Sequence, residues 1–85
     1  MEQRIGTITI LISDRNRSAE VNQILSQYGG IILCRQGLPF RERPIAVISL
    51  IVEGNMDQIN TLTGRLGRLD GVECKAALTK LRVEN

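Results

Sequence analysis

The chain has 85 residues, no histidine and no tryptophan, with a single tyrosine and a single phenylalanine. Without histidine it lacks the usual general base and the commonest protein ligand of transition metals. It also lacks a glycine-rich phosphate-binding loop ending in lysine, and its carboxylates are scattered over predicted turns. We therefore expect no catalytic residues, no metal and no cofactor, and predict that the protein is not an enzyme.

Cysteine is scarce as well, and its two occurrences do not form a ligand pair. Cys34 and Cys74 lie forty residues apart with no second cysteine near either, so we expect two reduced thiols that are buried as small hydrophobic side chains. No apolar run is long enough for a bilayer, and the first residues lack the apolar centre of a signal peptide. These absences predict a cytoplasmic protein with no membrane partner.

What the chain does contain is enough aliphatic sequence for one small core. It is 42% hydrophobic, and with so few aromatics this core has to consist of isoleucine, leucine and valine. A domain this small is marginally stable alone, so we expect one domain over residues 1–85 that associates with a partner. The formal charge of +2 is too small to indicate a nucleic-acid surface by itself.

The hydrophobic period changes along the chain in a way that predicts four strands and two helices. Strands are expected over residues 4–13, 31–36, 45–53 and 72–79, where β-branched residues dominate. A first helix follows a turn over residues 14–17, with Asn16 or Ser18 as its cap, and ends at Gly29-Gly30. A second helix starts at a capping box formed by Asn55 and Gln58.

Three further details follow from the same pattern. Gly64 and Gly67 lie inside the second helix, one turn apart, which suggests close backbone approach to a neighbour. Two prolines and a glycine over residues 37–44 predict a loop rather than a strand. Residues 81–85 are expected to be a frayed tail.

The element order β-α-β-β-α-β predicts an α+β, ferredoxin-like sandwich. Right-handed crossovers give a four-stranded antiparallel sheet in the order 4-1-3-2, with both helices on one face. Cys34 and Cys74 then lie on opposite edge strands, beyond the reach of a disulfide.

The other face of this sheet has no helix to cover it. On the two central strands it carries an uncharged set without aromatic rings, consisting of Thr7, Thr9, Leu11, Val47, Ser49 and Ile51. Monomers seldom leave such a patch in water, so we predict a homo-oligomer, dimer or tetramer, that hides it. The alternative is a wet sheet surface. The missing aromatic rings argue against a sheet that binds RNA by stacking.

A group of polar residues at the first strand-to-helix turn is the candidate ligand site. Arginines and turn amides beside a helix can hold a small carboxylate or phosphate. The commoner alternative is solvated charge paired with nearby carboxylates. The predicted site consists of Asp14, Arg15, Asn16, Arg17 and Arg35.

The run from Ile10 to Gly30 resembles the first half of an ACT domain, a regulatory module that binds amino acids. The ACT turn typically reads Asp-Arg-Pro-Gly, whereas this chain reads Asp14-Arg15-Asn16-Arg17. A second set of motifs spans nearly the whole chain and consists of Asp14-Arg15, Val21-Asn22, Arg35-x-Gly37-x-Pro39, Arg41-Glu42, Ala46, Leu62 to Gly67, and Gly71-Val72. In these motifs the chain resembles the iron-only hydrogenase system regulator family, whose members are candidate transcriptional regulators.

This resemblance implies an oligomeric ferredoxin-like module similar to the C-terminal domain of nickel-responsive repressors. Those repressors bind nickel chiefly through histidines, so nickel is not expected here, and we expect no separate DNA-binding arm. Two functions follow as hypotheses. One is a regulatory module that oligomerises and senses a small anionic effector or binds a partner regulatory protein. The other is direct nucleic-acid binding through the arginines, which we do not expect without a partner. A structural scaffold is a third reading.

Overall fold

A computed structural model describes residues 2–84 of the chain, with side chains as far as residue 79. The elements follow in the predicted order: β1 (Glu2–Ile12), the 3-10 turn η1 (Arg15–Arg17), α1 (Ser18–Ser26), β2 (Ile32–Pro39), β3 (Ala46–Gly54), α2 (Met56–Gly67) and β4 (Val72–Glu84). The strands form one antiparallel sheet in the order β2-β3-β1-β4. The ferredoxin-like topology is confirmed, because this order is 4-1-3-2 read from the other edge.

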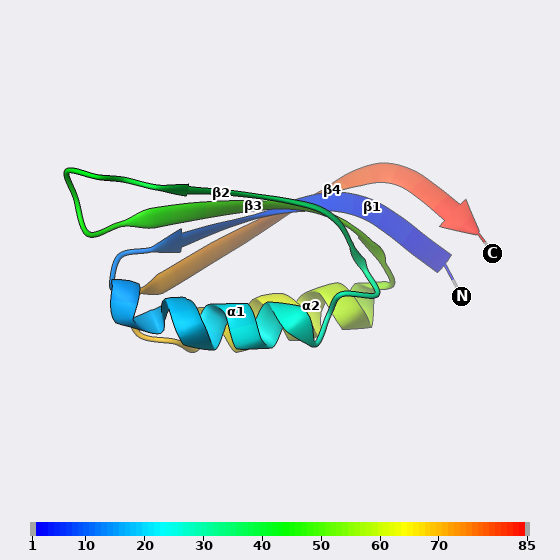
Figure 1. Cartoon of the computed structure of the whole chain (residues 1–85). Coiled ribbons are helices and arrows are strands. Elements are labelled where there is room, and N and C mark those ends of the chain that lie inside the picture. The colour runs from blue at the N-terminus through cyan, green and yellow to red at the C-terminus, as the bar shows by residue number, and fades with distance from the viewer. Residues whose placement is uncertain (1, 85) are drawn as a thin grey trace.

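Both helices lie beneath one face of the sheet (Figure 1). The hydrophobic core fills the space between them and this face, and its side chains alternate along β1 and β3 as a half-buried strand requires. Within the described residues, no helix combines the length and the apolarity needed to cross a bilayer. The core consists of Ile8, Ile10, Ile12, Val21, Ile24, Leu25, Ile31, Ile48, Leu50, Val52, Ile59, Leu62, Leu66 and Val72.

The second helix begins as predicted. The side chain of Asn55 accepts from the Gln58 amide at 2.8 Å, and the Gln58 side chain accepts from the Asn55 amide at 2.9 Å. This reciprocal pair satisfies two amides that otherwise lack helical partners. The apolar residues Ile59, Leu62 and Leu66 then form a stripe that points into the core.

The first helix begins differently from the prediction of a cap at Asn16 or Ser18. Asp14 instead caps η1, its carboxylate accepting from the Asn16 amide at 3.0 Å. The residue before α1 is Arg17, which makes no side-chain capping bond. The prediction was wrong because the 3-10 turn comes first, and so the capping site moves to Asp14, two residues after the end of β1.

Strand β2 departs from the prediction in length and in register. It continues to Pro39, because an edge strand leaves one row of backbone groups without a partner and so tolerates proline. A bulge between Ile32 and Cys34 shifts the pairing with β3. As a result Ile32 and Arg35 lie on the helix side of the sheet, whereas a regular strand would place them on opposite faces.

The end of the chain is a strand and not a frayed tail. β4 runs to Glu84 and pairs with the first residues of β1, past an irregularity between Arg4 and Gly6. Gly6 permits this close approach, since a Cβ there would lie 2.7 Å from the Ala77 carbonyl oxygen. The last residue of the predicted tail, residue 85, lies outside the described residues.

The glycines with a structural role are not the ones inside α2. Gly64 and Gly67 are exposed, and a Cβ on either would meet nothing within 4 Å, so the expected close approach is absent. Gly71, between α2 and β4, has φ +78°, and its carbonyl accepts from the Ser13 amide at 2.8 Å. A Cβ on Gly71 would lie 2.8 Å from the Cβ of Asp14. This contact joins the two turns at one end of the molecule.

We predict opposite effects of alanine at these two kinds of position. Gly71→Ala should lower the free energy of unfolding by about 1–3 kcal/mol, because it forces a left-handed conformation and a clash with Asp14. Gly64→Ala, the matched control, should raise it by about 0.5–1 kcal/mol through helix propensity. Urea denaturation measures both changes. Equal effects of the two substitutions would contradict this description of the Gly71 turn.

Candidate functional site

The open face of the sheet, opposite the helices, carries side chains from all four strands in three cross-strand rows. The pairing registers define each row, since directly opposite residues share a face. Taken from β2 through β3 and β1 to β4, the rows are Leu38, Val47, Leu11 and Glu73; Gln36, Ser49, Thr9 and Lys75; and Cys34, Ile51, Thr7 and Ala77. All six residues of the predicted surface lie on this face.

The described residues leave this face uncovered. Leu38 is 58% exposed and Ile51 is 41% exposed. Leu50, which precedes Ile51 in β3 and points to the helix side, is fully buried. Leu11 and Val47 are half-buried. The apolar patch expected from the sequence is therefore present in the folded chain.

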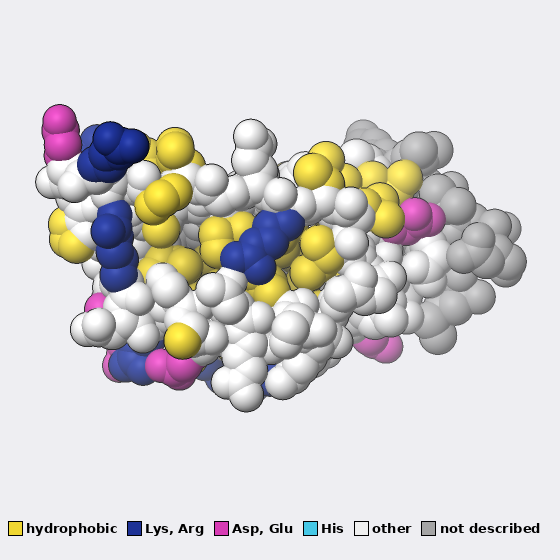
Figure 2. Space-filling model, viewed as in Figure 1, with side chains coloured by type: hydrophobic (Ala, Val, Ile, Leu, Met, Phe, Trp, Pro, Cys, Tyr) yellow, Lys and Arg dark blue, Asp and Glu magenta, His cyan; other side chains and the backbone are white. Residues whose placement is uncertain are grey.

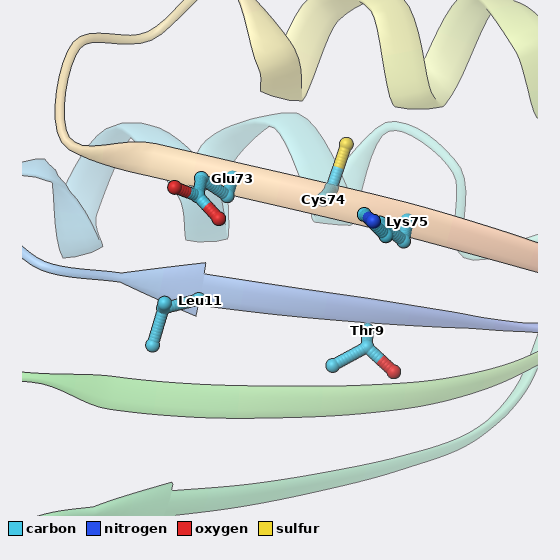
Figure 3. A pocket seen from close by; sticks show the side chains of 5 residues that line it. All are labelled: Thr9, Leu11, Glu73, Cys74 and Lys75. Carbon is cyan, nitrogen blue, oxygen red and sulfur yellow. The ribbon is translucent and has the colours of Figure 1, made fainter.

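The edge strand β4 adds charged residues to the open face, which the prediction from the two central strands did not include. The six predicted residues of β1 and β3 are uncharged, but Glu53 shares their face farther along β3, opposite Ile5, and Glu73 and Lys75 bring opposite charges to the same face on β4. Together with Thr9 and Leu11 they line a shallow hollow, while the Cys74 thiol points to the other side of its strand (Figure 3). Strict alternation along β4 would have revealed both charges.

A second hollow lies at the opposite edge of the face, on β2 and β3 next to the loop that connects them into a hairpin. Leu38, Val47 and Phe40 line it together with Gln36, Gly37 and Ser49. The Arg43 guanidinium lies over the Phe40 ring, 5.3 Å from its centroid. The sequence analysis missed this group because it ended β2 at Gln36 and treated the next residues as a loop.

The predicted ligand residue Arg15 is tied to the hairpin. Its guanidinium donates to the carbonyl oxygen of Phe40, to that of Arg43 at 3.2 Å and to that of Ile45 at 3.4 Å. Figure 2 shows basic side chains gathered at this end of the molecule, where the hairpin and η1 lie. Arg15 thus fixes the hairpin that carries Phe40 and Arg43.

The other predicted ligand residues also have partners within the chain. The Arg17 guanidinium pairs with the Glu20 carboxylate at 2.7 Å, and this hydrogen bond and charge raise the pKa of Arg17. Arg35 donates to the side-chain oxygen of Asn22 on α1. Because Arg35 lies on β2, it is separate from the other four, which are consecutive at the β1–η1 turn.

The two cysteines are free and differ in environment. Cys34 is exposed on the open face, so the prediction of a buried thiol was wrong for this residue, because β2 is an edge strand and no helix covers that face. Cys74 is half-buried under α2, where its thiol donates to the Thr63 carbonyl oxygen at 3.2 Å, and burial raises its pKa. Among the described residues no cluster of cysteine and carboxylate side chains is suited to a metal ion.

Comparison with known proteins identifies the family. The model described as "TM1266-like: Iron-only hydrogenase system regulator, putative" matches residues 4–76. The chain belongs to this family. The match spans β1 to the middle of β4. It therefore includes both the open face and the turn of residues 14–17, the arginine turn.

A solved structure of a similar protein supports the assignment. The chain is 35% identical to the uncharacterized protein TM1266 from Thermotoga maritima, with a TM-score of 0.87. The alignment covers 92% of this chain and 99% of the Thermotoga chain. No curated protein matches. The family description names a regulator of the iron-only hydrogenase system, and the site is interpreted below in that light.

We predict that Arg15 stabilises the hairpin locally. In Arg15→Ala the Phe40 amide, which donates to the Ile45 carbonyl at 3.0 Å, should exchange its hydrogen about fivefold faster, since the lost bonds are worth roughly 1 kcal/mol. Hydrogen exchange followed by NMR measures this. Arg41→Ala, at the tip of the same hairpin, is the control and should leave the rate unchanged. An unchanged rate in Arg15→Ala would contradict the assigned role.

Proposed function

We propose that this chain is a non-catalytic regulatory module that works as a homo-oligomer, in which a second copy covers the open sheet face. The observation that carries the proposal is the exposed apolar set on β1 and β3. The family description, a regulator of the iron-only hydrogenase system, supports the regulatory part. The proposal places the module in the cytoplasm, where both thiols stay reduced.

The physical reason for association is the small size of the core. Both central strands carry aliphatic side chains on both faces, but the two helices cover only one face (Figure 1). Covering the other face removes side chains such as Ile51, Leu38 and Val47 from water, at about 25 cal/mol per Å² of apolar area. A copy of the same face is suited to this, because isologous contacts close into a dimer.

Direct nucleic-acid binding is the weaker alternative. Single-stranded RNA is held on such sheets by aromatic rings of the central strands, and β1 and β3 carry none. Three arginines of the proposed cluster are engaged within the chain: Arg15 with the hairpin carbonyls, Arg17 with Glu20 and Arg35 with Asn22. Salt-dependent retention on DNA would favour this alternative over the regulatory module.

Sedimentation equilibrium at micromolar concentration tests the proposed association. The wild-type chain should have at least twice the monomer mass of 9.5 kDa. Thr7→Glu, on the open face, should raise the dissociation constant at least about thirtyfold, because a buried unpaired carboxylate costs roughly 2 kcal/mol or more. Thr61→Glu, on the exposed surface of α2, is the matched control and should have no effect. A wild-type chain that sediments only as monomer would remove the proposal.

Effector sensing at Asp14, Arg15, Asn16, Arg17 and Arg35 is the second part of the proposal. An anion at this turn has to compete with the hairpin carbonyls for Arg15 and with Glu20 for Arg17. Such competition links ligand binding to the position of the hairpin and therefore to the edge of the open face.

Thermal unfolding with inorganic phosphate tests the effector site. We expect the melting temperature to rise with phosphate concentration, as for any ligand that binds only the folded state. The rise should disappear in Arg15→Ala and persist in Arg65→Ala, a control whose guanidinium donates to the Gln27 side chain just after α1. An equal rise in both variants would exclude the arginine turn as the site.

A further inference from the structure

The two ends of the open face differ in chemistry in a way that makes the face complementary to itself. The hairpin end is a hollow with an apolar lining, where Leu38, Val47 and Phe40 meet. Arg43 lies on Phe40 and supplies positive charge at its border. This end suits an occupant that presents an aliphatic side chain next to a carboxylate.

The β4 end of the same face presents that combination. Leu11 and Glu73 lie directly opposite each other on β1 and β4, and both belong to the row that ends at Leu38. Within the described part of the chain Glu73 forms no ion pair, and neither does Arg43. The face therefore carries an unpaired carboxylate at one edge and an unpaired guanidinium at the other.

We propose that two copies pack face to face about a two-fold axis parallel to the strands, with Glu73 of each copy paired to Arg43 of the other. This inference rests on the proposed function and specifies its geometry. The rotation exchanges β3 with β1 and β2 with β4, so Leu11 packs on Val47 and Glu73 lies above Leu38 beside Arg43. Each contact occurs twice, and aligned packing of this kind is usual for stacked sheets.

The remaining rows fit the same arrangement. In the middle row Lys75 faces the side-chain amide of Gln36, and Ser49 faces Thr9. In the third row Ile51 faces Thr7. The other simple choice is a two-fold axis that runs along the rows, perpendicular to the strands. It places Lys75 of one copy against Lys75 of the other, and this like-charge contact is unfavourable.

Arg15 has an indirect part in this interface. It bonds to the carbonyls of Phe40 and Arg43 and so holds both residues at the border of the hollow. A ligand that draws Arg15 away would loosen the Arg43 side of each contact. The arrangement thus provides a physical link between the arginine turn and self-association.

Charge reversal and mixing test the pairing, with dissociation constants from sedimentation equilibrium of the full chain. Glu73→Arg and Arg43→Glu should each raise the constant at least about tenfold, because each places two like-charge contacts in the dimer. Arg68→Glu, on the helix layer, is the control and should leave it unchanged. Circular dichroism of each variant confirms that the fold is retained.

An equimolar mixture of the two single variants gives the decisive result. In the heterodimer every contact again joins opposite charges, so the mixture should regain an affinity within about threefold of wild type. The double variant should regain it as well. Two results would overturn this pairing while leaving self-association intact. In one, the wild-type chain dimerises and neither single variant changes the dissociation constant. In the other, the single variants dimerise more weakly and mixing them does not restore the affinity. A monomeric wild type would overturn both.

Discussion

The structure depends on one imbalance between its sheet and its helices. Both central strands carry aliphatic side chains on both faces, together with threonine and serine on the open one, but the two helices cover only one face (Figure 1). The covered face is fully packed, with Ile8, Leu50 and Leu62 completely buried. The open face retains aliphatic and β-branched side chains in water. We propose that self-association covers the open face without any additional element.

The β2–β3 hairpin and the arginine turn are connected, because Arg15 of the turn anchors the hairpin. Once β2 is an edge strand, its hairpin extends past the helices and needs an anchor, which Arg15 provides through three carbonyls. The residues that a pattern search selects as a ligand site are thus also structural. In this account an effector acts by competing for these bonds, and regulation needs no catalytic group.

Most of the fold was predictable from the sequence because its signals are local. The alternation along β1 and β3, the stripe that ends at Leu66, and the capping box at Asn55 each depend on a few adjacent residues. The bulge after Ile32 and the extension of β4 depend on a partner strand, which local patterns do not contain. Pro39 was misplaced for the same reason, since proline is tolerated in β2 only because that strand lies at an edge.

The candidate site was predictable in its centre and not at its borders. Alternation placed the six central residues correctly, because strand geometry fixes the face on which each lies. The bonds of Arg15 join segments 25 or more residues apart, and Arg43 stacks on Phe40 within the hairpin loop; both depend on flexible side chains. No spacing rule predicts such contacts. They require the register of the folded sheet and the path of its hairpin.

The central claim is that a second copy covers the open face, and isotope-filtered NMR tests it most directly. A mixture of isotopically labelled and unlabelled chains reports only contacts between copies. We predict intermolecular nuclear Overhauser effects from the methyl groups of Leu11, Val47 and Ile51, and none from the outer surfaces of α1 and α2. Intermolecular contacts confined to the helices, or none at concentrations where the chain sediments as an oligomer, would contradict the account.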